Sequence, residues 1–168
     1  MDQKKALLDN SKLDSALGTG CNRHFGALDQ RYLCQSIGTL NPPEPLTVEA
    51  TTSLAEVLRV LQSNKVGCVI VTDPDGKLDG IFSERDWILK VAELDVDIER
   101  TPVSEVMTRK PVSESMNSTI AFALSLMSQG GFRHLPIVDQ EHIPIGIVSV
   151  KDVVDHMVLS CLQELLDF

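Results

Sequence analysis

The strongest constraint on how this chain folds is an internal repeat. The segment Gly80-Ile81-Phe82-Ser83-Glu84-Arg85-Asp86 recurs 66 residues later as Gly146-Ile147-Val148-Ser149-Val150-Lys151-Asp152. At this same offset, residues 103–168 align on residues 37–102 without a gap. A gapless repeat indicates one supersecondary unit used twice, with faces that pack on each other.

Each copy of the motif predicts a strand that runs into a helix, with serine at the helix start and aspartate in its first turn. A helix N-terminus has unpaired amides and the positive end of the dipole, so it suits phosphate. A carboxylate one turn on can accept hydrogen bonds from a ribose diol. Gly80 and Gly146 would let the ligand approach the strand closely. The alternative is a capping box, which needs no ligand; two copies in register favour a site.

Each unit predicts the element order β-α-β-β-α. In the first unit, the capping box Ser53-Leu54-Ala55-Glu56 opens a helix, and Asp73-Pro74-Asp75-Gly76 is a strong turn between two strands. The elements expected in the first unit are an extended segment 46–48, a helix from 53, strands 67–72 and 78–82, and a helix 83–92. Those expected in the second unit are a helix with apolar positions over 120–127, strands 134–138 and 145–149, and a helix 150–165.

The composition limits the function classes. No apolar run approaches the roughly 20 residues of a membrane span, and residues 1–9 lack the apolar core of a signal peptide. The net charge of −9 argues against a broad nucleic-acid surface. We therefore expect a cytoplasmic protein with neither a membrane nor a nucleic-acid partner.

The cysteines and motifs argue against metal and enzyme chemistry. Cys21, Cys34, Cys68 and Cys161 are widely spaced, so we expect reduced thiols. Cys21-x-x-His24 with Cys34 is a fragment of a metal site without an evident fourth ligand. The sequence contains no HExxH, GxSxG or Walker A motif. It therefore predicts no catalytic residues, no metal, no required cofactor and no enzyme activity.

Residues 1–36 differ from the repeats, because they are polar and lack a sustained period. We interpret them as an N-terminal arm with short helices near 4–8 and 28–33; a disordered tail is the alternative. The predicted organisation is an arm, 1–36, and two repeats, 37–102 and 103–168.

The last helix has a long apolar stripe, formed by Val153, Val154, Met157, Val158, Cys161, Leu162 and Leu165. Trp87, Ile88 and Val91 form its shorter counterpart in the first unit. Long exposed apolar patches are unfavourable, so the part not covering the unit's own sheet predicts self-association as a homodimer. A stripe that is entirely internal core is the alternative.

These features together resemble the CBS-domain pair, or Bateman module. Besides the Gly-h-h-Ser-x-x-Asp motif, Val103-Ser104-Glu105-Val106-Met107-Thr108 looks like the family's lead-in to a repeat. The segment Phe132-Arg133-His134-Leu135-Pro136-Ile137-Val138-Asp139 looks like its central strand. The resemblance covers about 37–168 and implies an α/β (α+β) fold, with tandem repeats packed about a pseudo-twofold axis around two clefts.

The resemblance also implies a ligand and its binding residues. The clefts of this family often bind AMP, ADP, ATP, NAD or S-adenosylmethionine, with the motif serine or threonine at phosphate and the motif aspartate at ribose. Two such pairs commonly form a disc-shaped dimer. For this chain the implied ligand-binding residues are Ser83 with Asp86, Ser149 with Asp152, Val66 with Gly67, and Phe132 with Arg133.

The two repeats differ in charge at one position. Arg133 and His134 are suited to phosphate, whereas Gly67 and Cys68 align with them in the first unit and are uncharged. Further cations that could reach a phosphate are Lys65, Arg85 and Lys151. We therefore expect tighter phosphate binding in the cleft of Asp152. The alternatives are that Arg133 reaches across to the other cleft, or that it forms a solvated strand end.

The function expected from the sequence is a regulatory, non-catalytic sensor of an adenosyl ligand, which signals to an unidentified regulated protein by rearrangement of repeats or subunits. The alternative is a structural or dimerisation adaptor with an empty or vestigial site.

Overall fold

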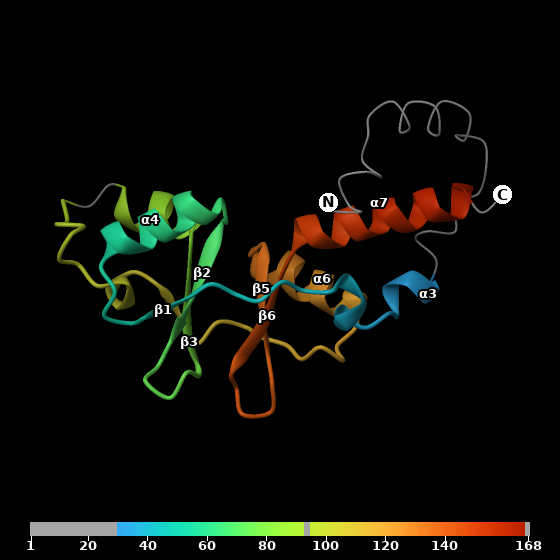
Figure 1. Ribbon diagram of the computed structural model, residues 1–168, viewed down its shortest axis with the longest axis horizontal. Helices are drawn as coiled ribbons and strands as arrows, with labels where there is room; N and C mark the ends of the chain where they lie inside the picture. Colours follow the sequence, from blue (N-terminus) through green and yellow to red (C-terminus); the bar gives the residue numbers. More distant parts are fainter. Residues whose placement is uncertain (1–29, 93–94, 167–168) are drawn as a thin grey trace.

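The computed structural model describes the backbone of residues 30–92 and 95–166 and shows two α/β bodies side by side (Figure 1). The first elements of the chain are α3 (Gln30–Leu33), the 3-10 turn η2 (Ile37–Leu40), β1 (Thr47–Glu49), α4 (Leu54–Asn64), β2 (Cys68–Thr72), β3 (Leu78–Ser83), α5 (Glu84–Asp86) and η3 (Trp87–Val91). They are followed by the 3-10 turn η4 (Val103–Glu105), β4 (Thr108–Arg109), α6 (Ile120–Gly130), β5 (His134–Val138), β6 (Pro144–Ser149) and α7 (Val150–Leu166).

The offset of the sequence repeat is also the offset of the structure. α6, β5 and β6 begin and end 66 residues after α4, β2 and β3, respectively. The predicted tandem β-α-β-β-α architecture is therefore confirmed. The counterpart of β1 in the second unit is reduced to one parallel bridge, Glu114 to Ile137.

Each unit is built on an antiparallel hairpin. β2 pairs with β3 from Cys68–Ser83 to Thr72–Leu78, and β5 pairs with β6 from His134–Ser149 to Val138–Pro144. β1 adds to β2 in parallel, and β4 adds to β3 in antiparallel orientation, which gives the sheet order β1-β2-β3-β4. The strand that starts each hairpin therefore begins beside the serine of its own motif.

Local sequence explains the turns and helix ends. The Asp73 carboxylate accepts hydrogen bonds from the amides of Asp75 and Lys77, both at 2.9 Å, and Gly76 has a φ of 80°. Asp139 has the same role at the second hairpin. The Ser53 hydroxyl accepts from the amide of Glu56 at 3.3 Å, as an N-cap should.

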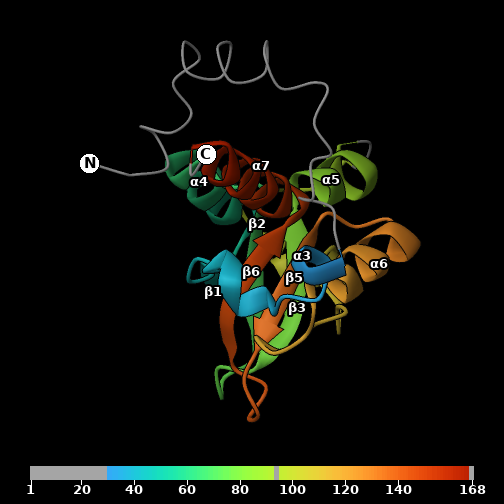
Figure 2. The same ribbon diagram turned by 90° about the vertical axis from the view of Figure 1, so that its right-hand side faces the viewer.

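The final helices of the two units differ. α7 is a regular helix of 17 residues. α5 has only three α-helical residues and continues as the π-helical segment η3, where the Ala92 amide donates to the Trp87 carbonyl at 2.9 Å. Figure 2 shows α5 and the start of α7 on the same side of the strands. No helix in the described part of the chain is long and apolar enough to cross a membrane.

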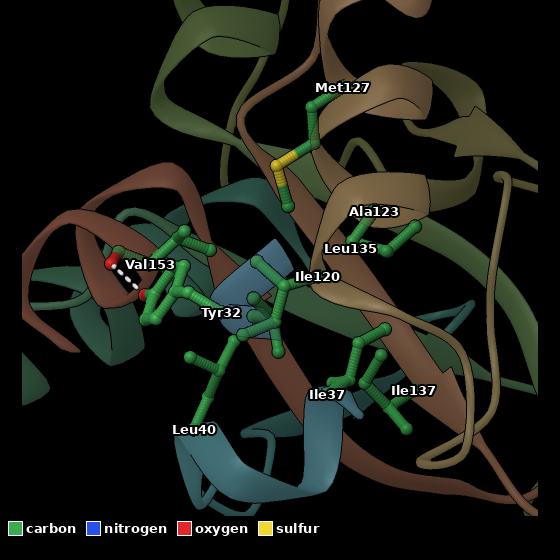
Figure 3. Packing of buried hydrophobic residues seen from close by; sticks show 10 residues of the cluster. Tyr32, Ile37, Leu40, Ile120, Ala123, Met127, Leu135, Ile137 and Val153 are labelled. Carbon is green, nitrogen blue, oxygen red and sulfur yellow. Dashed lines mark hydrogen bonds between the residues drawn. The ribbon is translucent and has the colours of Figure 1, made fainter. Parts of the chain in front are cut away.

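In each unit, the segment that precedes the strands packs in the hydrophobic core of the other unit. Ile37 and Leu40 precede the first unit's strands, yet they pack in the core of the second unit with Ile120 and Leu135 (Figure 3). Reciprocally, the core of the first unit contains three residues that precede the second unit's strands, Val103, Val106 and Met107. Each body is therefore completed by the lead-in segment of the other unit.

The end of the predicted arm is part of the second core. The Tyr32 side chain is 5% exposed, and its hydroxyl donates to the Val153 carbonyl of α7 at 3.1 Å (Figure 3). His156 Nδ1 lies 3.2 Å from the same hydroxyl. Tyr32 thus attaches this part of the chain to α7, while the helix predicted near 4–8 lies outside the described residues.

Candidate functional site

Two clefts carry the predicted site residues. The cleft containing Asp152 has a volume of about 460 Å³, and the cleft containing Asp86 has a volume of about 500 Å³. We call them the Asp152 cleft and the Asp86 cleft. The Asp152 cleft is lined by Ser149, Lys151 and Asp152 together with Lys65 and Val66; the Asp86 cleft is lined by Ser83, Arg85 and Asp86 together with Phe132. Gly67, Arg133 and His134 line both.

Each cleft therefore combines parts of both units. In each case the Ser-x-x-Asp motif of one unit faces the residues that precede the first hairpin strand of the other unit. All twelve predicted binding residues line one cleft or the other, although their role in ligand binding stays a prediction. Arg133 does not belong to one cleft, so it cannot by itself give the Asp152 cleft the advantage that the sequence comparison suggested.

Both Ser-x-x-Asp motifs form capping boxes. Ser149 donates through its hydroxyl and its amide to Asp152 Oδ2, at 2.7 and 2.8 Å, and the Asp152 amide donates to the Ser149 hydroxyl at 3.2 Å. In the first unit Ser83 and Asp86 make the same contacts at 2.7, 2.9 and 3.4 Å. Each motif thus orients its aspartate rigidly and uses one carboxylate oxygen.

The second carboxylate oxygen distinguishes the clefts. Asp86 Oδ1 pairs with the Lys90 ammonium at 2.7 Å and accepts from the Thr108 hydroxyl at 3.2 Å. Partial burial acts against ionisation, but the hydrogen bonds from Lys90 and Ser83 hold the pKa of Asp86 below its usual value. Within the described residues, Asp152 Oδ1 has no hydrogen-bond partner. Of the two motif carboxylates, Asp152 is therefore the one with an oxygen that accepts no hydrogen bond from another described residue.

The motif glycines serve packing. A Cβ at Gly80 would lie 2.4 Å from Met107 Sδ, and one at Gly146 would lie 3.0 Å from the Cβ of Pro42. Both glycines are buried. The expectation that they admit the ligand to the strand is therefore wrong: they accommodate the lead-in segment that crosses from the other unit.

His134 and Gly67 meet where the two clefts share a wall. A Cβ at Gly67 would lie 3.2 Å from both Cε1 and Nε2 of His134, so the absence of a side chain makes room for the imidazole. Burial, followed by the nearby Arg133 charge, lowers the pKa of His134, against the opposing effect of Asp152 and Glu84. At neutral pH the shared wall therefore holds a neutral imidazole.

The potential metal ligands and the thiols of the described residues form no metal site. No group of three or more potential metal ligands occurs in the described part of the chain. Cys34 is exposed, while Cys21 and His24, the other members of the suggested fragment, lie outside the described residues. Burial, with the charges of Asp86 and Glu84, raises the pKa of Cys68 to about 12, so this thiol in the wall of the Asp152 cleft stays protonated.

Sequence reasoning missed several lining residues. Glu44 and Glu84 line the Asp152 cleft, and Leu89, Thr108 and Lys110 line the Asp86 cleft. The sequence did contain a signal for two of them. Glu44-Pro45 and Lys110-Pro111 are related by the repeat offset of 66 residues, so Glu44 and Lys110 occupy equivalent positions.

A comparison with protein-family models matches the CBS domain twice, at residues 37–93 and 103–159. The chain belongs to the CBS domain family. Its sequence is 34% identical over 109 residues to the CBS domain-containing protein CBSCBSPB1 of Arabidopsis thaliana, a match covering 65% of this chain and 20% of that protein. The CBS pair thus spans about a fifth of the length of this relative. An uncharacterised protein of Methanocaldococcus jannaschii is 30% identical over 146 residues, covering 68% of this chain and 87% of its own.

Solved structures agree with the family. The CBS-domain containing protein ATU1752 from Agrobacterium tumefaciens superposes with a TM-score of 0.67 and 34% identity, covering 73% of this chain and 98% of its own. The structure of CBSX2 in complex with AMP superposes with a TM-score of 0.64 and 26% identity, covering 74% and 97%. The fold of this chain is therefore that of a CBS pair.

Proposed function

We propose that this CBS pair is a regulatory, non-catalytic module that binds an adenosyl ligand in its two clefts. The observation that carries the proposal is the composition of each cleft, in which a Ser-x-x-Asp motif from one unit faces the strand start of the other. The open Oδ1 of Asp152 suits a ribose hydroxyl. A relative with the same fold was solved with AMP. The candidates are AMP, ADP, ATP, NAD and S-adenosylmethionine.

The composition of the clefts suggests how binding becomes a signal. Because each ligand would touch both units, its binding energy depends on how the units pack and can bias that packing. A regulated protein, in a cytoplasmic setting, would then respond to the preferred arrangement. A ligand can shift the arrangement only by the difference in its affinity for the two states.

The proposal is tested by measuring the unfolding temperature and the calorimetric binding curve with each candidate ligand. A ligand present at about 100 times its Kd should stabilise the protein by about 2.7 kcal/mol. The doubly substituted protein, Asp86→Ala with Asp152→Ala, is the control and should lose this stabilisation. If no candidate changes the unfolding temperature or gives a binding curve, the sensor proposal fails.

One specific observation favours the alternative function, a structural adaptor. Both motifs complete capping boxes without a ligand, and Asp86 Oδ1 is already paired with Lys90. A protein that binds none of the candidates, yet is destabilised by the Asp152→Ala substitution through loss of the cap, would be an adaptor with vestigial clefts.

The absence of catalysis is a separate part of the proposal. After incubation with ATP, NAD or S-adenosylmethionine, chromatography should recover each compound unchanged. Loss of a compound in proportion to protein, abolished by Asp152→Ala, would contradict the non-catalytic assignment.

We also propose a homodimer formed through η3 and α7. Ile88 is 64% exposed and Val154 is 45% exposed, although the sequence places both in the predicted apolar stripes. The predicted stripe is thus divided: Val91, Val153 and Leu162 are buried in the chain's own cores, while Ile88 and Val154 are left for a second copy.

A further inference from the structure

The two clefts have opposite charges at one equivalent position. Lys110 lines the Asp86 cleft, and Glu44 lines the Asp152 cleft. The two residues are related by the repeat offset, and each precedes a proline that lines the same cleft, Pro111 and Pro45. Both side chains are exposed. Two sites that arose from one repeat therefore present a cation in one case and a carboxylate in the other.

The remaining charges increase this difference. The Asp86 cleft is lined by three cations and one carboxylate, namely Arg85, Lys110, Arg133 and Asp86. The Asp152 cleft is lined by three cations and three carboxylates, namely Lys65, Arg133, Lys151, Glu44, Glu84 and Asp152. Because Arg133 lines both, it does not distinguish them.

Two ion pairs with residues outside the clefts increase the charge difference between the clefts further. Lys90 pairs with Asp86 at 2.7 Å and offsets the one carboxylate of its cleft. Asp155 pairs with Lys151 at 2.6 Å and offsets one of the cations of the other cleft. The Asp86 cleft is therefore the electropositive one, and the Asp152 cleft is close to neutral.

We propose that the clefts divide adenosyl ligands by charge: the Asp86 cleft takes a phosphate-bearing adenosyl ligand, and the Asp152 cleft takes an adenosyl ligand without net negative charge. This proposal rests on the proposed function, since it concerns the same two sites. It reverses the order expected from the aligned sequences, because that order assigned Arg133 to the Asp152 cleft alone.

The carboxylates support the same division. In the Asp152 cleft the open Oδ1 offers a full hydrogen-bond acceptor to a ribose diol, so a ligand can be held there through its nucleoside. In the Asp86 cleft both carboxylate oxygens already have partners, so the nucleoside gains less and the phosphate contacts matter more. Asp86 retains its ion pair while the other cations face the phosphate.

The test is a reciprocal charge exchange at the two exposed positions. Calorimetry with AMP and with adenosine is carried out on the full chain, on Lys110→Glu and on Glu44→Lys, and Asp86→Ala and Asp152→Ala assign each binding event to a cleft. Lys110→Glu should weaken AMP at the Asp86 cleft by about tenfold, and Glu44→Lys should strengthen AMP at the Asp152 cleft by a similar factor. Adenosine should change by less than about twofold in both variants, and added salt should reduce the AMP effects.

The outcomes separate the two proposals. The division by charge is wrong if AMP and adenosine have the same order of affinity for the two clefts, or if AMP binds the Asp152 cleft more tightly than the Asp86 cleft. Adenosyl binding itself would still stand. If neither AMP nor adenosine binds, and the other candidates fail as well, both proposals fail. Should Asp86→Ala not fold, the change in AMP affinity between Lys110→Glu and the unmodified chain still decides the assignment.

Discussion

At the scale of single residues, the contact between Gly67 and His134 joins the two units at the wall shared by the clefts. The pKa of His134 is lowered chiefly by burial and then by Arg133. The unfolded chain therefore binds a proton near pH 6.5 that the native state takes up only at lower pH. Stability is fully present above this value and is lost as the pH falls from the unfolded pKa toward the folded one.

This dependence gives a prediction for His134→Gln. The urea midpoint of the unmodified protein should fall between pH 7.5 and 5.5, and the variant should lose part of this slope. His142→Asn, at an exposed hairpin position, is the control and should keep the slope. Equal slopes in His134→Gln and the unmodified protein would show that the imidazole titrates normally.

Gly80 gives a second prediction, because its missing side chain makes room for Met107. In Gly80→Ala the new Cβ would overlap the buried Met107 side chain, which should reduce the free energy of unfolding by about 1–3 kcal/mol. In Gly38→Ala the nearest atom to the new Cβ is 3.5 Å away, and stability should change by less than about 0.5 kcal/mol. Urea unfolding measures both, and equal midpoints would contradict the packing role of Gly80.

The sequence predicted residues that line the clefts better than it predicted the contacts of those residues. The twelve predicted residues all line the clefts. The repeated motif marked the strand–helix junctions, whereas Val66, Gly67, Phe132 and Arg133 were implied by the resemblance to the CBS pair. The ion pair between Asp86 and Lys90 could have been expected from the sequence, because helix side chains four residues apart lie close together. The sharing of Arg133 was one of the alternatives left open by the sequence, which could not decide it because it depends on the packing of one unit against the other.

At the scale of elements, the repeat register predicted most strands and helices closely, with β5 (His134–Val138) matching the predicted bounds. Helix caps and hairpin turns are set by interactions between residues close in sequence, so the sequence predicts them without knowledge of the packing. The π-helical form of η3 was not predicted, because its apolar positions fit an ordinary helix as well. The exchange of Ile37 and Val103 between the cores was also missed: an apolar pattern shows that a residue is buried but not in which core.

The attachment of Tyr32 to α7 can be tested by substitution. Tyr32→Phe removes the hydroxyl that donates to the Val153 carbonyl and should reduce the free energy of unfolding by about 1 kcal/mol. Tyr32→Ala also empties a buried site and should cost about 3–5 kcal/mol, as for other large aromatic truncations. Urea unfolding of the full chain gives both values. Unchanged midpoints would support the alternative of a disordered tail up to the first repeat.

At the scale of the whole molecule, the proposed homodimer would depend on the exposed part of the apolar stripe. Light scattering across a dilution series should give twice the chain mass of 18.4 kDa. Ile88→Lys should lower this to the mass of one chain, because a buried lysine would be left without a partner in the interface.

Phe122→Lys is the matched control for the dimer. Phe122 is 50% exposed but lies on α6, outside η3 and α7, so its substitution should leave the mass unchanged. A monomer in the unmodified protein, or equal effects of the two substitutions, would contradict the proposed interface.

The exchange of lead-in segments has a consequence for the ancestry of the fold. A lone repeat carries a lead-in such as η2 that has no core of its own to fill, while its own core lacks the residues that Val103 and Met107 provide. Two separate copies could satisfy each other only by trading these segments between chains. Residues 37–102 expressed alone should therefore be stable only as an intertwined pair. Gene duplication and fusion would then have converted a concentration-dependent assembly into a single chain whose halves meet at a high effective concentration.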